Sequence, residues 1–219
     1  MNKERFLALW QRTLGTAAMD AEQAFTTLEE LYAAPGRHYH NGCHVQHCLL
    51  WLDRYRSHAI NADAIELAIW FHDAIYEFQA CDNEQRSAEL FLQCSLGADQ
   101  TLRRYIYDLI LATTHRQPPT NPDQALIMDV DLSSFALPWH PFIKDSVRCR
   151  KEKAFLTDPE FFAKQICFWE SLLARSAFFY TPVFFHEHEQ QARENVKRML
   201  ELMVERGYDC SLNKQCQSA

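Results

Sequence analysis

The chain contains only 5 glycines among its 219 residues, and this scarcity is the feature that most limits what it can fold into. Alternating apolar and polar stretches, which are typical of strands, are also scarce, whereas apolar residues recur at helical spacing. The sequence therefore predicts an all-α protein. The main expected helices cover residues 6–15, 20–33, 44–55, 62–78, 82–97, 101–115, 121–135, 159–177 and 187–206.

No linker, repeat or shift in composition interrupts these helices. Hydrophobic residues make up 47% of the chain and include 15 Phe, which is ample material for one large core. We therefore expect a compact single-domain helical bundle over residues 1–219, with helices at 139–207 packing on a core at 37–132 and a loose tail at 208–219.

Charge and cysteine usage exclude several classes of function. The net charge of -7 argues against binding to a nucleic-acid polymer or an anionic membrane. No apolar run approaches the ~20 residues of a membrane span, and the N-terminus lacks the pattern of a signal peptide. The 8 cysteines are scattered without a CxxC pair, which favours free thiols and a cytoplasmic location.

The stretch WFHDAIYE places His72 and Asp73 side by side in an expected helix with apolar neighbours. Adjacent helical residues point about 100° apart, so these two side chains do not pair with each other. A buried carboxylate also needs compensation. Either Asp73 reaches water and His72 is a satisfied core histidine, or a metal ion lies between their directions and binds both.

Other histidines cluster before helices or at their ends. In RHYHNGCH, His40 lies in a loop beside Arg37, and His44 begins an apolar helix, whereas His38 fits a solvated loop. His115 ends a helix, where it can interact with the helix dipole or belong to a site.

Three further segments contain charged residues whose roles depend on where their side chains point. In LIMDVDLSSF, at least one of Asp129 and Asp131 should face inward and need a partner. In CDNEQRSA we expect a capping box with Asp82 as the N-cap and Gln85 as the N3 residue, and Glu84 stays open as a site residue. Arg150 belongs to a basic helix face that is either solvated or binds phosphate.

His44, then His72–Asp73, then Asp131, each on its own expected helix, resemble the H…HD…D pattern of the HD superfamily of metal-dependent phosphohydrolases. A longer series of motifs is similar to a branch of predicted HD phosphohydrolases: RHYHNGCH…WFHDAIY…DNEQRSA…TTHR…DVDLS. The similarity extends from about Arg37 to Leu132.

The resemblance implies a helical bundle of the HD-domain type around a divalent metal ion: Mn, Fe, Ni, Zn or Mg. It implies hydrolysis of a small phosphate ester, including nucleotides, by a metal-activated water. The residues that it implies are metal ligands His44, His72, Asp73 and Asp131, with His115 for a second ion; catalytic Asp73 and Glu84; and substrate-binding Arg37, His40 and Arg150.

Three other functions stay open at this point. An HD-fold di-iron oxygenase would use His115 as a true ligand. A non-catalytic module would bind a nucleotide or a partner, and a plain helical protein would keep its histidines as core residues. The expected partner is a small phosphorylated substrate, with no nucleic-acid polymer and no membrane, and the sequence makes no prediction of oligomeric state.

Overall fold

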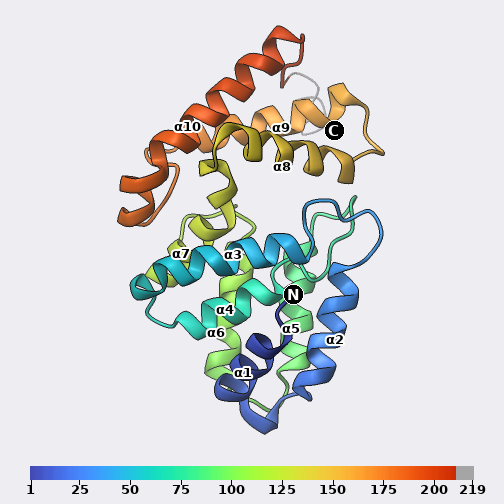
Figure 1. Ribbon diagram of the computed structural model, residues 1–219, viewed down its shortest axis with the longest axis vertical. Helices are drawn as coiled ribbons and strands as arrows, with labels where there is room; N and C mark the ends of the chain where they lie inside the picture. The colour runs from blue at the N-terminus through green and yellow to red at the C-terminus, as the bar shows by residue number, and fades with distance from the viewer. Residues whose placement is uncertain (211–219) are drawn as a thin grey trace. The chain divides into compact units, whose positions relative to one another are not determined.

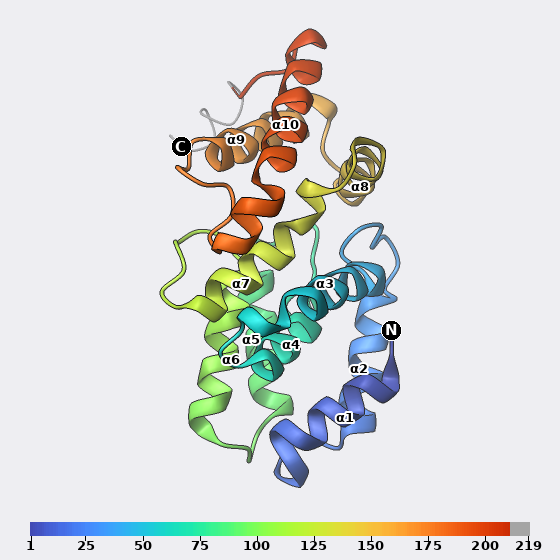
Figure 2. The same cartoon turned by 60° about the vertical axis from the view of Figure 1, so that its left-hand side comes forward.

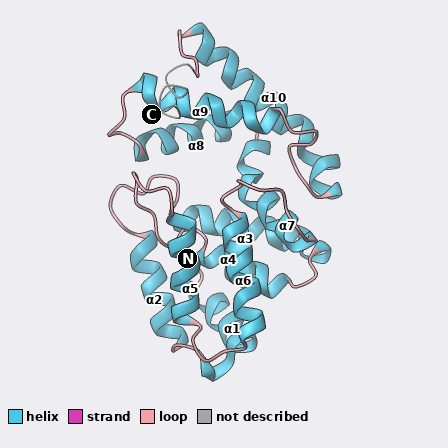
Figure 3. Cartoon of the chain, turned by 180° about the vertical axis from the view of Figure 1, so that it is seen from behind, coloured by secondary structure: helices cyan, strands magenta, loops and turns pink. Residues whose placement is uncertain are grey.

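The computed structural model describes residues 1–210, and every regular element within them is a helix, so the all-α prediction is confirmed (Figure 3). The chain divides into two compact units, Met1–Asp131 and a second that begins at Leu132. The expectation of a single domain stays a prediction, and the predicted loose tail falls mainly on residues 211–219, outside the described residues. Among the described helices, none has the length and apolar character needed to cross a membrane.

The first unit is a bundle of seven α-helices (Figure 1). Their order is α1 (Lys3–Leu14), α2 (Ala21–Tyr32), α3 (Gly42–Tyr55), α4 (Ala62–Phe71), α5 (Asn83–Cys94), α6 (Gln100–Ala112) and α7 (Pro122–Asp131), with short 3-10 turns at Gly15–Ala17 and Arg56–His58. Local chemistry sets most of the starts, because the side chains of Asn2, Asp20, Asn61 and Asp99 each accept a hydrogen bond from a backbone N–H of the first turn.

Helix α4 lies at the centre of this unit (Figure 2). All its residues from Ala64 to Phe71 are buried, and α1, α3, α5, α6 and α7 all contact it. Its Trp70 and Phe71 meet the rings of Phe6, Trp10 and Phe91 at centroid distances of 5.2 to 6.1 Å. A helix that is largely apolar on every side is stable only in such a position.

Two buried carboxylates tie the helices together around this core. Glu66 on α4 pairs with Arg5 at 2.7 Å and with Arg56 at 2.8 Å. Asp123 on α7 accepts hydrogen bonds from the amides of Ile60 and Asn61 at 2.7 and 2.8 Å. The hydroxyl of Tyr105 on α6 donates a third hydrogen bond to Asp123 at 2.7 Å. The start of α7 is therefore fixed to α6 and to the turn before α4, and this aims the other end of α7, which carries Asp131.

The second unit contains a 3-10 turn (Leu132–Ala136), α8 (Trp139–Glu152), α9 (Asp158–Leu173) and α10 (Pro182–Glu205). Phe135 packs on Phe142 and Phe178 at centroid distances of 5.7 and 5.4 Å. Glu189 on α10 accepts hydrogen bonds from the amides of Phe178 and Phe179, which turns the α9–α10 connection back onto α10.

Several predicted helix limits are wrong: α7 ends at Asp131 instead of 135, α9 at Leu173 instead of 177, and α10 begins at Pro182 instead of 187. Two further errors lie close to the candidate site. Helix α4 ends at Phe71, well before the expected end at residue 78. Asp82 stands at the N-cap of α5, but its side chain makes no capping hydrogen bond, so the expected capping box is absent. The Gln85 amide that would have completed it instead donates to Glu89 and to the hydroxyl of Tyr107.

Candidate metal centre

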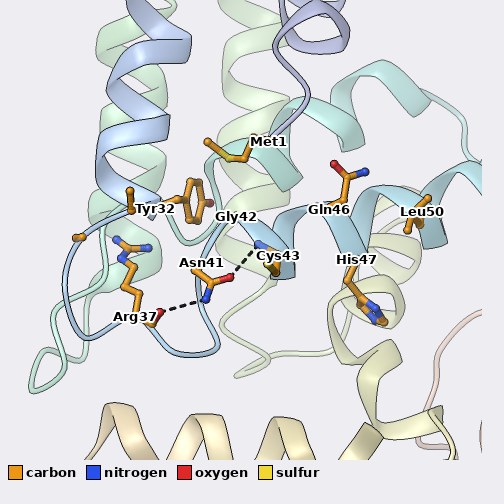
Figure 4. A pocket seen from close by; sticks show the side chains of 11 residues that line it. Met1, Tyr32, Arg37, Asn41, Gly42, Cys43, Gln46, His47 and Leu50 are labelled. Atoms are coloured by element: carbon orange, nitrogen blue, oxygen red, sulfur yellow. Dashed lines mark hydrogen bonds between the residues drawn. The ribbon is translucent and has the colours of Figure 1, made fainter.

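The first turn of α3 positions His44. The side chain of Asn41 caps this helix: its Oδ1 accepts from the amide of Cys43 at 2.8 Å, and its Nδ2 donates to the carbonyl of Arg37 at 3.1 Å (Figure 4). The loop and the helix start are therefore one hydrogen-bonded unit. His44 follows in the first turn, and Cys48 lies one turn later on the same helix face.

The HD dipeptide lies where the chain leaves α4. His72 is the C-cap residue of this helix and Asp73 follows it. The guanidinium of Arg37 donates to the carbonyls of Asp73 and Ala74, each at 2.6 Å. Arg37 thus supplies two of the carbonyls at this helix end with partners, and a continued helix would need the same carbonyls for its own amides. The side chains of Ser87 and Asn83 also take the amides of Ile75 and Glu77, at 3.0 and 2.9 Å, which a continued helix would need. Together these bonds explain why α4 is shorter than its apolar pattern predicts.

Four side chains from α3, α4 and α7 converge at these ends. The Nε2 atoms of His44 and His72 are 3.2 Å apart. The Oδ1 of Asp131 lies 3.1 Å from Nε2 of His44 and 3.5 Å from Nε2 of His72. The Oδ2 of Asp73 lies 3.1 Å from Nε2 of His72 and 3.6 Å from Nε2 of His44. The structure therefore brings the four principal predicted ligands into one buried cluster.

The spacing of these atoms fits a shared metal ion. Two donor atoms that each lie ~2.1 Å from one ion are about 3.0 Å apart at a right angle and about 3.4 Å apart at the tetrahedral angle. The five distances above, from 3.1 to 3.6 Å, fall around these values. Nδ1 of His72 lies 2.8 Å from the carbonyl of Ile69, so in the neutral ring Nδ1 carries the proton and Nε2 presents its lone pair to the centre.

His115 also reaches this centre. Its Nε2 lies 2.8 Å from Oδ2 of Asp131, so the two oxygens of this carboxylate face different histidines. The backbone of His115 has a φ of 55°, the left-handed region that a non-glycine residue seldom adopts. That conformation just after α6 turns the ring toward Asp131 instead of continuing the helix.

Cys48 is the site residue that sequence reasoning missed. Its Sγ lies 3.7 Å from Nε2 of His44, and the side chain is 1% exposed. His44, Cys48, His72 and Asp131 each offer a ligand atom, and these atoms all lie within 4.8 Å of one another. The available signal was the four-residue spacing from His44, which places both residues on one helix face.

The charges of the cluster are strongly coupled. Burial raises the pKa of Asp73, but the adjacent His72 and the nearby His40 and His44 outweigh it, so its pKa lies below the ordinary value. Asp131 behaves in the same way through hydrogen bonds from three histidines. Burial lowers the pKa of His72, yet the two carboxylates hold it well above the usual value. Without a metal, the centre therefore favours ionised carboxylates at Asp73 and Asp131 and a protonated imidazole at His72.

Glu84 differs from these acids. It lies in the first turn of α5 and is half-buried. Its pKa is raised, first by burial and then by the negative charges of Asp73 and Asp131. Glu84 is thus close enough to be affected by the charges of the centre, and it is easier to protonate than an exposed glutamate.

The three predicted substrate-binding residues have different surroundings. His40 stacks on Tyr76 at 4.3 Å and its charge lowers the pKa of Asp73, so it stands beside the centre. The guanidinium of Arg37 is bonded to backbone carbonyls, as described above. Arg150, in the second unit, pairs with Asp158 and donates to the carbonyls of Lys153 and Leu156. Both arginines therefore have a structural role, and phosphate binding by them stays a prediction.

A hollow of about 660 Å³ opens beside Arg37, between the end of α2 and the start of α3 (Figure 4). Arg37, Asn41 and Cys43 line it together with His47, whose pKa is lowered to about 4 by burial and by the charge of His44. None of its described lining residues is acidic. The hollow is large enough for a small molecule and carries no carboxylate to repel an anion.

The described part of the second unit contains a separate group of potential ligands. Cys167, Glu170 and Cys210 offer atoms within 4.8 Å of one another, and the Glu170 side chain is exposed. This group shares no residue with the buried cluster of the first unit.

Comparison with known proteins adds no relationship: no family model matches the chain, and no curated protein or solved structure is significantly similar to it.

Proposed function

We propose that the protein is a metal-dependent phosphohydrolase of the HD type that acts on a small phosphate ester, including nucleotides. One observation carries the proposal: nitrogen and carboxylate atoms of His44, His72, Asp73 and Asp131 converge at the spacing that one divalent ion requires. The order of these residues along the chain is that of the H…HD…D pattern.

His44, His72 and Asp131 would hold the ion, and these donors suit Mn²⁺, Fe²⁺, Ni²⁺ or Zn²⁺ better than Mg²⁺. A bound ion would supply a Lewis acid for a phosphoryl oxygen and lower the pKa of a bound water towards ~7. The Nδ1–H of His72 donates to Ile69, so its ring is held in the orientation and tautomer that binding needs.

Asp73 and Glu84 divide the proton transfers between them. The pKa of Asp73 is depressed, so the carboxylate is ionised at neutral pH, orients the attacking water through Oδ2 and accepts its proton. Glu84 has a raised pKa, so it carries a proton more readily and delivers it to the leaving oxygen. Two carboxyl groups whose environments move their pKa values apart are the arrangement that acid–base catalysis uses.

Arg37 acts in this proposal as a positioning residue. Its bonds to the carbonyls of Asp73 and Ala74 fix the backbone that carries the Asp73 carboxylate. His40, beside Asp73, is the residue best placed to meet a substrate phosphate. The hollow beside Arg37 is of a size that suits the organic part of a small ester.

The test is elemental analysis of the purified protein beside a His72→Ala/Asp73→Ala variant. We expect about one transition metal ion per chain, lost in the variant. The matched control is His58→Ala/Asp82→Ala, which removes the same residue types from exposed positions. A phosphatase screen with the identified metal follows, in which Asp73→Ala should abolish hydrolysis and keep the helical circular dichroism. Absence of metal from the parent protein, even after supplementation, would refute the proposal.

A second candidate, a di-iron oxygenase, is favoured by one specific observation. His115 meets the second oxygen of Asp131 at 2.8 Å, so these two residues would hold a second ion. Iron at about two per chain and an absorption band that develops on aeration would select this function.

A further inference from the structure

A sulfur atom faces the proposed metal centre from α3. Cys48 Sγ lies 3.7 Å from Nε2 of His44 and 3.9 Å from its Nδ1. The thiol lies 4.0 Å from the carbonyl of Val130, one residue before Asp131 on α7. Cys48 on α3 thus faces α7, close to both His44 and the residue before Asp131.

The distances from Cys48 fit a four-coordinate site. A sulfur ~2.3 Å and a nitrogen ~2.1 Å from one ion are about 3.6 Å apart at the tetrahedral angle. The observed separation between Sγ of Cys48 and Nε2 of His44 is 3.7 Å. The sulfur also lies within 4.8 Å of the ligand atoms of His72 and Asp131, and a shared ion would bring each of these pairs within about 4.4 Å.

Asp73 is placed differently. It is absent from the group of four whose ligand atoms all lie close to one another, although it contacts His72 and His44. Cys48 and Asp73 come from different helices, α3 and the end of α4, and His44 and His72 lie near both. The centre therefore has three shared ligands and two candidates for the fourth position.

We propose that Cys48 is the fourth permanent ligand, in a His44–Cys48–His72–Asp131 set, and that Asp73 is left to orient water or substrate. The inference rests on the proposed metal centre and specifies its chemistry. When the ion binds, the S–H bond breaks, a metal–sulfur bond forms and the proton passes to solvent, with no change of oxidation state. A thiolate in the set selects Zn²⁺, Fe²⁺ or Co²⁺ over Mg²⁺.

The alternative role for Cys48 is that of a small apolar core residue. Buried cysteines commonly have this role, and Cys94 on α5 is a clear example, since it is 2% exposed and outside both ligand groups. The two cysteines are matched in burial but differ in whether they face a cluster of ligand atoms. Cys94→Ser is therefore the control for Cys48→Ser.

The experiment uses Co²⁺, because a thiolate bound to this ion gives an intense near-ultraviolet charge-transfer band. The full chain carries Cys167→Ser and Cys210→Ser throughout, since these thiols form the other candidate ligand group. We expect one Co²⁺ per chain, the thiolate band, and the strong visible bands of a tetrahedral ion. Asp73→Asn should keep the near-ultraviolet band.

Cys48→Ser and Cys48→Ala should lose the near-ultraviolet band, while Cys94→Ser keeps it. Zn²⁺ binding, measured against a chromophoric chelator, should weaken at least about 100-fold in both Cys48 variants, because even outer-shell changes cost 10–100-fold. If Co²⁺ binds the parent without a thiolate band, or if Cys48→Ala keeps the band, the inference fails and the metal centre stands. If Co²⁺ does not bind at all, the proposed function fails with it.

Discussion

Replacement of Arg37 by Gln tests whether one side chain both ends α4 and supports the centre. The guanidinium makes three hydrogen bonds to the carbonyls of His40, Asp73 and Ala74, at 3.0, 2.6 and 2.6 Å. Bonds from a charged donor contribute about 1.5 kcal/mol each at the low end. Because Arg37 is half-buried, water replaces part of this, and we expect a loss of about 2–3 kcal/mol.

Such a loss should lower the thermal midpoint by roughly 5–10 °C for a chain of this length. The assay is thermal unfolding followed by circular dichroism in the presence of a chelator, so that metal binding does not contribute. Hydrolysis should fall as well, because the backbone that carries the Asp73 carboxylate loses its support.

Arg54→Gln is the matched control, since Arg54 is an exposed arginine on α3 whose guanidinium lies 5.2 Å from the centroid of the Tyr55 ring. It should change stability by less than about 0.5 kcal/mol. An Arg37→Gln midpoint equal to that of Arg54→Gln would refute the account of how α4 ends. Full stability in Arg37→Lys would show that charge alone suffices and that the bridging geometry of the guanidinium is unimportant.

Three further predictions concern other buried charges. Asp123→Ala leaves three donors without their acceptor and should lower the free energy of unfolding by about 3 kcal/mol in urea titrations; a loss under about 1 kcal/mol would contradict this. Glu189→Gln weakens the hold on two backbone amides of the second unit, and hydrogen exchange there should accelerate roughly tenfold, without change in the first unit. The metal-free protein should be most stable between about pH 4 and 6.5. Because the pKa values of Asp73 and Asp131 are depressed, these carboxylates contribute stability that is lost as the pH falls below about 4. Because the pKa of His72 is raised, this histidine contributes stability that is lost as the pH rises above about 6.5. Thermal midpoints measured across pH check this, and added Zn²⁺ should stabilise more as pH rises; a stability maximum above neutral pH in chelator would contradict it.

Local chemistry explains why most helices could be predicted from the sequence. Asp20 caps α2, and Pro35–Gly36 follow its end, so both limits are visible in a short window. The end of α4 was not visible in this way. Its apolar pattern continues to residue 78, and the residue that supplies the competing partner, Arg37, comes from the loop before α3. A local pattern cannot contain a contact between distant parts of the chain.

The residue types of the centre were easier to predict than their contacts. Histidines and acids in apolar segments had few ordinary explanations, so His44, His72 and Asp131 stood out. Cys48 did not, because a buried cysteine is unremarkable in a chain with 8 of them. Arginine is ambiguous because the N–H donors of its guanidinium bind phosphates and backbone carbonyls equally well. In the structure, Arg37 and Arg150 donate to carbonyls.

The corrected end of α4 also changes why His72 and Asp73 can be neighbours. In a continuous helix, adjacent side chains diverge by about 100°, and only a body between them could meet both. Here Asp73 lies beyond the helix, and its Oδ2 comes within 3.1 Å of Nε2 of His72. The Asp73 carboxylate therefore meets the His72 ring just beyond the end of α4. The Arg37 bonds therefore help to position Asp73, and their loss should displace Asp73 before His72, whose amide donates to the carbonyl of Ala68 in the last turn of α4.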